Sequence, residues 1–301
     1  MGASDEEGQK EASAKRLLEL CMVLRGCQEH GHSYRTINSF EPSSTSVLKE
    51  NQSDAVYGKD CAEALRSAFL RLSVVEDLLV GVARLLNPPV ETVFPQMILP
   101  RSIAEAAARG AYLVDPDVGA KERAARHLND RLNTLNRNIA LAMDPDDKAR
   151  LAKRREQVWD DAQSRGHTIK INKNGEKVYI DAHWPNATEL LGWLFQDDED
   201  SPLGAVIHRF YSQVMHVTPG GLLGEFEVGD EADENDVHLA VPAAKHSTLE
   251  LIVAVSLLSW ALAMDKLILA TGWEPDPWIG WRKKVFDTAR PGVAGGSPDG
   301  E

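Results

Sequence analysis

"LRSAFLRLSVVEDLLVGVARLLNPP", residues 65–89, decides the fold class of this chain. Within it and just before it, apolar side chains recur every three or four positions, which is the spacing of one helix face. The set is Val56, Leu65, Phe69, Leu72, Val75, Leu79, Val82, Leu85 and Leu86. The two prolines at its end disfavour helical backbone in the residue before them. The pattern predicts a helix over about 54–86 that forms the spine of a bundle.

Two further helices are predicted on either side of this spine. Residues 11–26 carry apolar side chains at helical spacing and stop near Gly26, so a first helix is expected there. Ser102-x-x-Glu105 is a capping-box pattern, in which the two side chains satisfy each other's backbone N–H groups at a helix start. It predicts a helix from Ser102 to about Val114.

Three later helices are marked by their first residues. Asn186 is a helix-capping residue type and predicts a helix through about Phe195, and Ser201 followed by proline starts the next one. A capping box at Ser247 opens the most apolar helix, about 247–271. Its uncharged run, at ~1.5 Å per residue, is shorter than a ~30 Å hydrocarbon core. We therefore expect a buried core helix and not a membrane span.

A charged pair of helices interrupts this apolar series. Residues 118–143 and 146–165 are periodic and are separated by a short Asp- and Pro-containing turn, so they are expected to form a projecting antiparallel arm over about 118–165. The arm carries a basic cluster that suits an RNA backbone. Its members are Arg131, Arg137, Lys148, Arg150, Lys153, Arg154 and Arg155. The alternative interpretation is a solvated face, because Asp and Glu are mixed in.

One β element is expected, in HTIKINKNGEKVYID, residues 167–181. Its Asn-Gly dipeptide fits a two-residue turn, which would place Ile171 opposite Val178 and Ile169 opposite Ile180. The apolar face of this hairpin should lie against helices. The chain is thus predicted to be all-α, a bundle of about eight helices with one inserted β-hairpin at about 167–181.

Length, charge and cysteine content narrow the class of protein. A chain of 301 residues supports one large core, so we expect a single domain over about 11–288 with disordered tails at 1–10 and 289–301. A formal net charge of −13 argues against a dedicated DNA-binding protein and requires any RNA contact to be local. Three cysteines without a C-x-x-C pair and an acidic first decapeptide favour a cytoplasmic location with no membrane partner.

The tryptophans of GWEPDPWIGW, at positions 273, 278 and 281, allow two interpretations. In the first interpretation, they form an aromatic clamp for a ligand or a base. Alternatively, they anchor the last helix to the bundle, because tryptophan buries a large apolar area.

The stretch HRFYSQVMH, residues 208–216, is the strongest functional candidate. In a helix, Arg209 and His216 share a face two turns apart, and Ser212 lies between them. A guanidinium can grip a phosphate with two donors, and an imidazole exchanges a proton near pH 7. This pair suits cleavage of a phosphodiester: His216 takes the ribose 2′-hydroxyl proton, Arg209 stabilises the developing charge, and Ser212 or Tyr211 holds the phosphate.

Arg209-x6-His216 resembles the R-x4-6-H signature of HEPN-type helical proteins, a superfamily that includes ribonuclease toxins and phage-defence effectors. A looser resemblance extends to uncharacterised bacterial helical proteins, in which R-x3-E-x3-R-x2-Y-L is followed by a helix containing Y-S-x3-H. The matching residues are Arg101, Glu105, Arg109, Tyr112 and Leu113, then Tyr211, Ser212 and His216.

The resemblance implies a helical bundle that dimerises through its motif helices, and RNA cleavage in the active members, with Arg209 and His216 as the working pair. The chain departs from the catalytic pattern at Phe210, where active members often carry a polar residue. If their helix faces the helix of Arg209, the row of Arg101, Glu105 and Arg109 is expected to supply a second phosphate grip and a carboxylate that orients His216. They otherwise form an exposed ion-pair stripe.

Two function classes therefore remain. The first is a HEPN-like, metal-independent endoribonuclease of the toxin or defence type. The second is a non-catalytic helical interaction protein with a protein partner or a second copy of itself, in which Arg209 forms ion pairs and His216 caps its helix. No metal or cofactor is expected in either case, because the sequence has no H-E-x-x-H, no glycine-rich phosphate loop and no G-x-S-x-G elbow.

Overall fold

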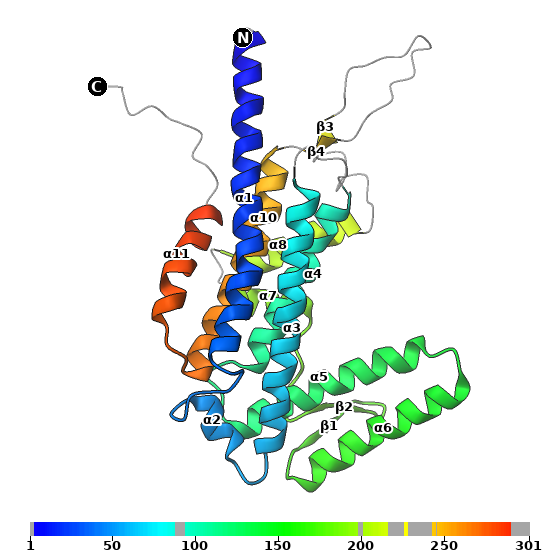
Figure 1. Cartoon of the computed structure of the whole chain (residues 1–301). Coiled ribbons are helices and arrows are strands. Elements are labelled where there is room, and N and C mark those ends of the chain that lie inside the picture. Colours follow the sequence, from blue (N-terminus) through cyan, green and yellow to red (C-terminus); the bar gives the residue numbers. More distant parts are fainter. Residues whose placement is uncertain are drawn as a thin grey trace, which may run out of the picture.

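The fold was derived from a computed structural model, which is all-α with small β elements (Figure 1). The structure describes residues 3–87, 94–197, 201–215, 226–227, 243–244 and 246–289. Its helices are α1 (Ala3–Ile37), α2 (Val47–Gln52), α3 (Gly58–Leu85), α4 (Phe94–Leu113), α5 (Ala120–Leu141), α6 (Pro145–Ser164), α7 (Ala187–Phe195), α8 (Leu203–Met215), α10 (His246–Thr271) and α11 (Asp276–Ala289). The strands are β1 (Ile169–Ile171), β2 (Lys177–Ile180), β3 (Phe226–Glu227) and β4 (Ala243–Ala244). The predicted fold class is confirmed, with ten described helices in place of about eight.

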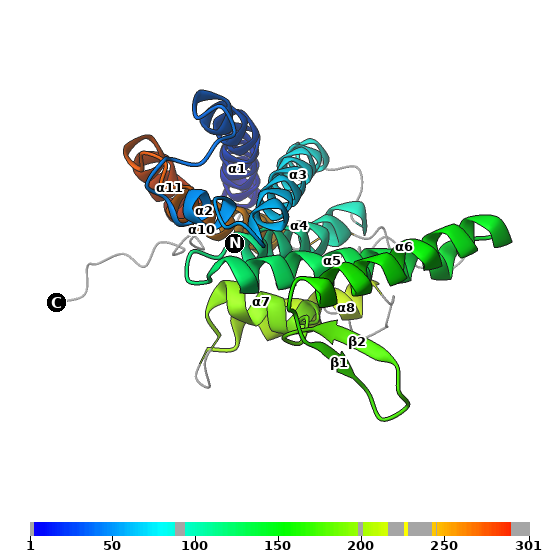
Figure 2. The ribbon, with the colours of Figure 1, turned by 90° about the horizontal axis from the view of Figure 1, so that it is seen from below.

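A trunk of long helices holds the main core. Helices α1, α3, α4 and α10 run side by side, and α11 lies along α1 and α10 (Figures 1 and 2). The spine α3 buries the predicted apolar stripe, and Leu72, Val75, Leu79 and Val82 are fully buried. Helix α10 is long and apolar enough to cross a membrane, but two thirds of its most apolar window, 67%, is buried inside the trunk.

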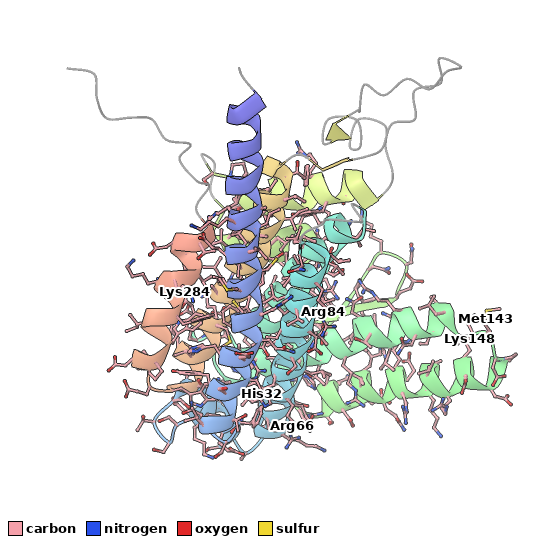
Figure 3. All side chains as sticks on the ribbon, turned by 45° about the horizontal axis from the view of Figure 1, so that its top comes forward. His32, Arg66, Arg84, Met143, Lys148 and Lys284 are labelled. Atoms are coloured by element: carbon pink, nitrogen blue, oxygen red, sulfur yellow. The ribbon has the colours of Figure 1, made fainter. Side chains whose placement is uncertain are left out.

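Helices α5 and α6 form the predicted arm, which leaves the trunk sideways and ends at Met143 and Lys148 (Figure 3). The arm has its own small core around Leu128, Leu132 and Trp159, which the hairpin completes with Ile180. Arg123 fixes its base, because the fully buried guanidinium donates to the carbonyls of Leu113, Asp115 and Val118. The arm is therefore held firmly where it joins α4.

The predictions for α1 and α4 were wrong at their ends. Helix α1 begins at Ala3, inside the predicted tail, and passes through Gly26 and Gly31. A Cβ at Gly26 would overlap the Trp281 ring, and one at Gly31 would overlap the Glu76 carboxylate. Both glycines therefore serve close packing and do not end the helix. Helix α4 begins at Phe94 and contains Pro100, so Ser102 lies inside the helix and caps nothing.

The other predicted boundaries are closer to the structure. Helix α7 has the predicted cap, since Asn186 and Glu189 form a complete capping box. Helix α8 begins directly after Ser201 and its proline, and α10 ends at Gly272, which has a φ of +62°. Ala289 belongs to α11, and the rest of the predicted tail, 290–301, lies outside the described residues.

The hairpin register differs from the prediction by one residue at its tip. Ile169 pairs with Ile180 as expected, but Ile171 stands opposite Lys177. The side chain of Asn172 accepts from the N–H groups of Asn174 and Glu176, and Gly175 takes a φ of +80°. This longer loop replaces the two-residue turn. The apolar face consequently packs at Ile180 and, in part, at Ile169, while Ile171 is 62% exposed.

The tryptophans near the C-terminus anchor α11. Trp273 and Trp278 are buried, and their indole N–H groups donate to the Glu41 carbonyl at 2.6 Å and to Asp265 at 2.7 Å. Trp273 also stacks on Phe69, with ring centroids 5.9 Å apart. These contacts match the anchoring interpretation and leave no open clamp at these two rings.

Candidate functional site

Helix α8 carries the predicted catalytic stretch as far as Met215. Arg209 is exposed and Ser212 is half-buried on this helix. His216 lies outside the described residues, so the geometry of the predicted Arg209–His216 pair stays a prediction. The neighbouring outward residues Leu203 and Val206 are 42% and 54% exposed, which gives the outer face of α8 an apolar character beside Arg209.

The start of α8 is fixed tightly against α7. The Asp197 carboxylate accepts from the N–H groups of Gly204 at 2.7 Å and Ala205 at 2.9 Å, where a negative group also favours the helix dipole. A Cβ at Gly204 would overlap the backbone of Leu191, so only glycine allows the two helices to approach this closely. The direction in which α8 presents its polar side chains is therefore set by its first turn.

Arg101 joins α4 to α8 at the centre of the site. Its Nε donates to Glu105 at 2.7 Å, and its Nη1 donates to the Ser212 hydroxyl at 3.1 Å. This side of α4 thus faces α8, which is the arrangement that the phosphate-binding interpretation of these residues required. We call the group formed by Arg101, Glu105, Arg109, His208 and Ser212 the α4–α8 seam. The Arg101 and Glu105 side chains are about a quarter exposed, at 23% and 24%, so solvent and ligands can reach them.

His208 is the histidine that the described residues place at the seam. Its Nδ1 lies 3.0 Å from the Thr188 hydroxyl on α7. Burial lowers the pKa of His208, the Arg101 charge lowers it further, and Glu105 opposes the shift. The imidazole is therefore neutral at pH 7 and able to accept a proton. Sequence reasoning missed His208, although it lies four residues before Ser212 and so on the same helix face.

Arg109 lies at the far end of the seam among like charges. Its Nε is buried and has no hydrogen-bond partner. Burial lowers the pKa of Arg109, and the charges of Arg137 and Arg71 lower it further, while Glu105 and Asp130 raise it. Asp130 is already paired with Arg71 at 2.6 Å, as Glu105 is with Arg101. Four guanidinium groups therefore share two carboxylates, and the seam holds surplus positive charge.

The position of Tyr211 contradicts its predicted role in holding the phosphate. It is 1% exposed, and its hydroxyl has no hydrogen-bond partner. Burial raises the pKa of Tyr211 well above its usual range. The ring packs in the core beside Phe210, with centroids 5.1 Å apart, so Tyr211 fixes α8 in place and does not face the seam.

Comparison of the chain with family models, with curated proteins and with solved structures gave no match. Within the part of the chain that the structure describes, no group of three or more His, Cys, Asp or Glu side chains is placed to hold a metal ion. The described chemistry of the seam therefore consists of arginine, imidazole, hydroxyl and carboxylate groups.

Proposed function

We propose that this protein binds single-stranded RNA at the α4–α8 seam and cleaves it without a metal ion. The observation that carries the proposal is the surplus of guanidinium charge along α4, at Arg101 and Arg109, with the imidazole of His208 and the Ser212 hydroxyl on the Arg101 side. A phosphodiester supplies the missing negative charge, and arginine is suited to bind it with two donors. In a chain of net charge −13, such a local basic patch is what an RNA contact requires.

The chemical step follows from these groups. Arg101 and Arg109 hold the phosphate oxygens, and Arg209 approaches from the exposed side of α8. A histidine, His216 or His208, takes the proton of the ribose 2′-hydroxyl as its oxygen attacks phosphorus. The bond from phosphorus to the 5′-oxygen breaks, and that oxygen takes a proton from water. The products are a 2′,3′-cyclic phosphate end and a 5′-hydroxyl end.

The arm supports the same function through its charge. Residues 120–165 contain eleven lysines and arginines and eight aspartates and glutamates, so the arm is positive on an acidic chain. Arg150 and Arg155 pair with Asp147 and Glu156 on the surface, and such exposed pairs are weak. The arm therefore attracts a polyanion toward the seam without fixing its sequence.

A second candidate function is binding without chemistry. The exposed Leu203 and Val206 on α8 favour it, because apolar side chains beside a charged site are suited to a protein partner or to a second copy of this chain. In this case the seam binds an anionic group of the partner and His208 serves only as a hydrogen-bond partner of Thr188.

Cleavage and binding separate the two candidates. Wild type, Arg109→Gln, His208→Ala and His216→Ala are incubated with end-labelled single-stranded RNA in EDTA, and binding is measured in parallel by fluorescence anisotropy. Arg66→Gln is the matched control, because Arg66 is an exposed arginine of α3 whose side chain is 70% accessible. We expect cleavage by wild type and by the control, weaker binding by Arg109→Gln, and binding without cleavage by one histidine variant.

Other outcomes decide against the proposal. RNA binding that depends on Arg109, with no cleavage by any form, supports the non-catalytic candidate. Absence of RNA binding by wild type at low salt overturns RNA as the ligand, and equal cleavage by wild type and both histidine variants overturns the proposed chemistry.

A further inference from the structure

A pocket of about 340 Å³ lies where the end of α4 meets the first half of α5 and the chain between β2 and α7. This volume is at the small end of the range for ligand sites. Its apolar lining includes the buried Ala125 and Ile180 and the exposed Ala182, and its polar lining includes Lys121, Glu122 and His183. None of these residues takes part in the α4–α8 seam.

Two aromatic rings form a corner of this pocket. Tyr112 and Trp184 have ring centroids 5.4 Å apart and stand nearly perpendicular, at 78°. Arg126 stacks on Tyr112, with its Cζ 3.8 Å from the ring centroid, and is held there by Glu122 and Asp115. The guanidinium therefore covers one face of Tyr112, and a flat ligand at the corner is left the Trp184 ring and the outer plane of the guanidinium for stacking.

The same segment of the lining begins with a strained turn that the protein holds in place. Asp181 has a φ of +54°, and the N–H of Ala182 donates to the Ile180 carbonyl at 2.7 Å, which makes a tight turn that non-glycine residues rarely adopt. The Asp181 carboxylate accepts from the Thr168 N–H at 2.7 Å and lies 2.6 Å from His167 Nδ1.

Asn129 holds the same turn from the side of α5. Its amide donates to the carbonyls of Ile180 and Ala182, and its oxygen accepts from the Ile180 N–H at 2.8 Å. Strain that is maintained by this many directed bonds is typical of functional sites. Here it brings Ala182 and Trp184 against the pocket.

The chemistry of the walls defines the class of ligand. Aromatic faces and an arginine plane favour stacking with a planar ring, and the polar rim favours a ring whose edge carries donors and acceptors. A nucleobase has both properties and fits a small pocket. The pocket also lies on the helix that carries the seam, since Tyr112 follows Arg109 by three residues, or one turn of α4.

We infer that this pocket binds an unpaired nucleobase of an RNA strand whose phosphates lie on the α4–α8 seam. The inference rests on the proposed function for the source of the base, while the stacking chemistry applies equally to a free nucleotide. The pocket then sets which single-stranded position is presented to the seam.

The test uses variants that block the pocket and leave the seam intact. Ala182→Leu fills it from an exposed position, and Trp184→Leu removes one wall. Val178→Ala is the control, because Val178 is an exposed hairpin residue outside the pocket. Probes are a single-stranded RNA, the same strand with one abasic position, adenosine 5′-monophosphate, and ribose 5-phosphate. Thermal unfolding of each variant is recorded. If Trp184→Leu does not fold, the binding result for Ala182→Leu alone tests the inference.

We expect both pocket variants to lose at least about fivefold in affinity for the base-containing strand and for adenosine 5′-monophosphate. The abasic strand should bind the wild type and the variants equally, and ribose 5-phosphate should show no difference. Equal binding of intact RNA by wild type and Ala182→Leu overturns the pocket inference but leaves the proposed function standing. Nucleotide binding that Ala182→Leu abolishes, without RNA binding by wild type, supports the pocket and overturns the proposed function. No binding of any probe overturns both.

Discussion

Two arginine–glutamate pairs in the trunk have opposite surroundings. Arg35 and Glu76 are sealed in the core, with side chains 1% and 3% exposed, and both guanidinium Nη atoms contact the carboxylate at 2.6 Å. Trp260 adds an indole N–H to the same carboxylate at 3.3 Å. Arg101 and Glu105 are about a quarter exposed and lie beside Arg109, whose buried Nε has no hydrogen-bond partner.

The difference separates a structural ion pair from a candidate binding site. In the sealed pair, one positive group meets one negative group and water is excluded, so no ligand is needed to balance it. In the α4–α8 seam, guanidinium groups outnumber carboxylates and solvent has access. Charge balance and exposure, taken together, therefore distinguish the two better than the presence of an ion pair does.

The largest expected effect is on stability, from Glu76→Gln. The substitution leaves the buried Arg35 charge without a counter-charge, which costs about 3–5 kcal/mol of the free energy of unfolding. Urea unfolding measures it. Glu63→Gln is the control, since it breaks the exposed pair with Arg66 and should cost under about 1 kcal/mol. Similar losses in the two variants would show that the buried pair is not sealed.

The seam should respond in the opposite way, which Arg109→Gln tests. Removing one of several like charges changes the free energy of unfolding by less than about 1 kcal/mol, because repulsion is relieved as contacts are lost. RNA affinity falls about tenfold, and the salt slope of binding falls by about one. Anisotropy titrations at several salt concentrations measure both. A large loss of stability with unchanged RNA affinity would place Arg109 with the structural pairs.

The pKa of His208 reports the seam charge directly. Arg101→Gln removes one of the two causes that lower this pKa, so the value rises but burial keeps it below the ordinary one. Because the folded pKa is depressed, the unfolded chain takes up the proton first as pH falls below about 6.5, and stability is lost from there down to the folded pKa. Arg101→Gln narrows the pH range over which this stability is lost. Histidine NMR titration measures the shift, with Arg66→Gln as the control that should not move it.

Sequence patterns predicted the trunk because the side chains that a helix buries recur every three or four residues. The apolar stripe of α3 and the cap of α7 needed only local information. The predicted cap of α10 was wrong, because the helix begins at His246 and Ser247 lies inside it. Gly26 misled because a glycine that ends a helix and one that admits a neighbouring ring are the same residue in a sequence. The hairpin register depended on the side chain of Asn172, whose local bonds replaced the shorter turn.

The site was predicted in part for the same reason. Arg101, Glu105 and Arg109 repeat every four residues, and Ser212 shares a face with the residue pair around it, so each half of the seam is visible in sequence. Arg71, Arg137 and Thr188 reach the seam from α3, α5 and α7 through tertiary packing alone. No spacing in the sequence marks them, and the surplus charge exists only after these helices meet.

The smallest expected effect comes from Tyr211→Phe, on the buried side of the same helix. The hydroxyl is buried without a hydrogen-bond partner, and removing an unsatisfied polar group stabilises the fold by up to about 1 kcal/mol. RNA binding and cleavage should not change, because the ring faces the core and not the seam. Urea unfolding and the EDTA cleavage assay measure the two quantities on one preparation. A variant that folds as stably as wild type but loses cleavage would place the Tyr211 hydroxyl in the reaction, and the division of α8 into a structural face and a functional face would then be wrong.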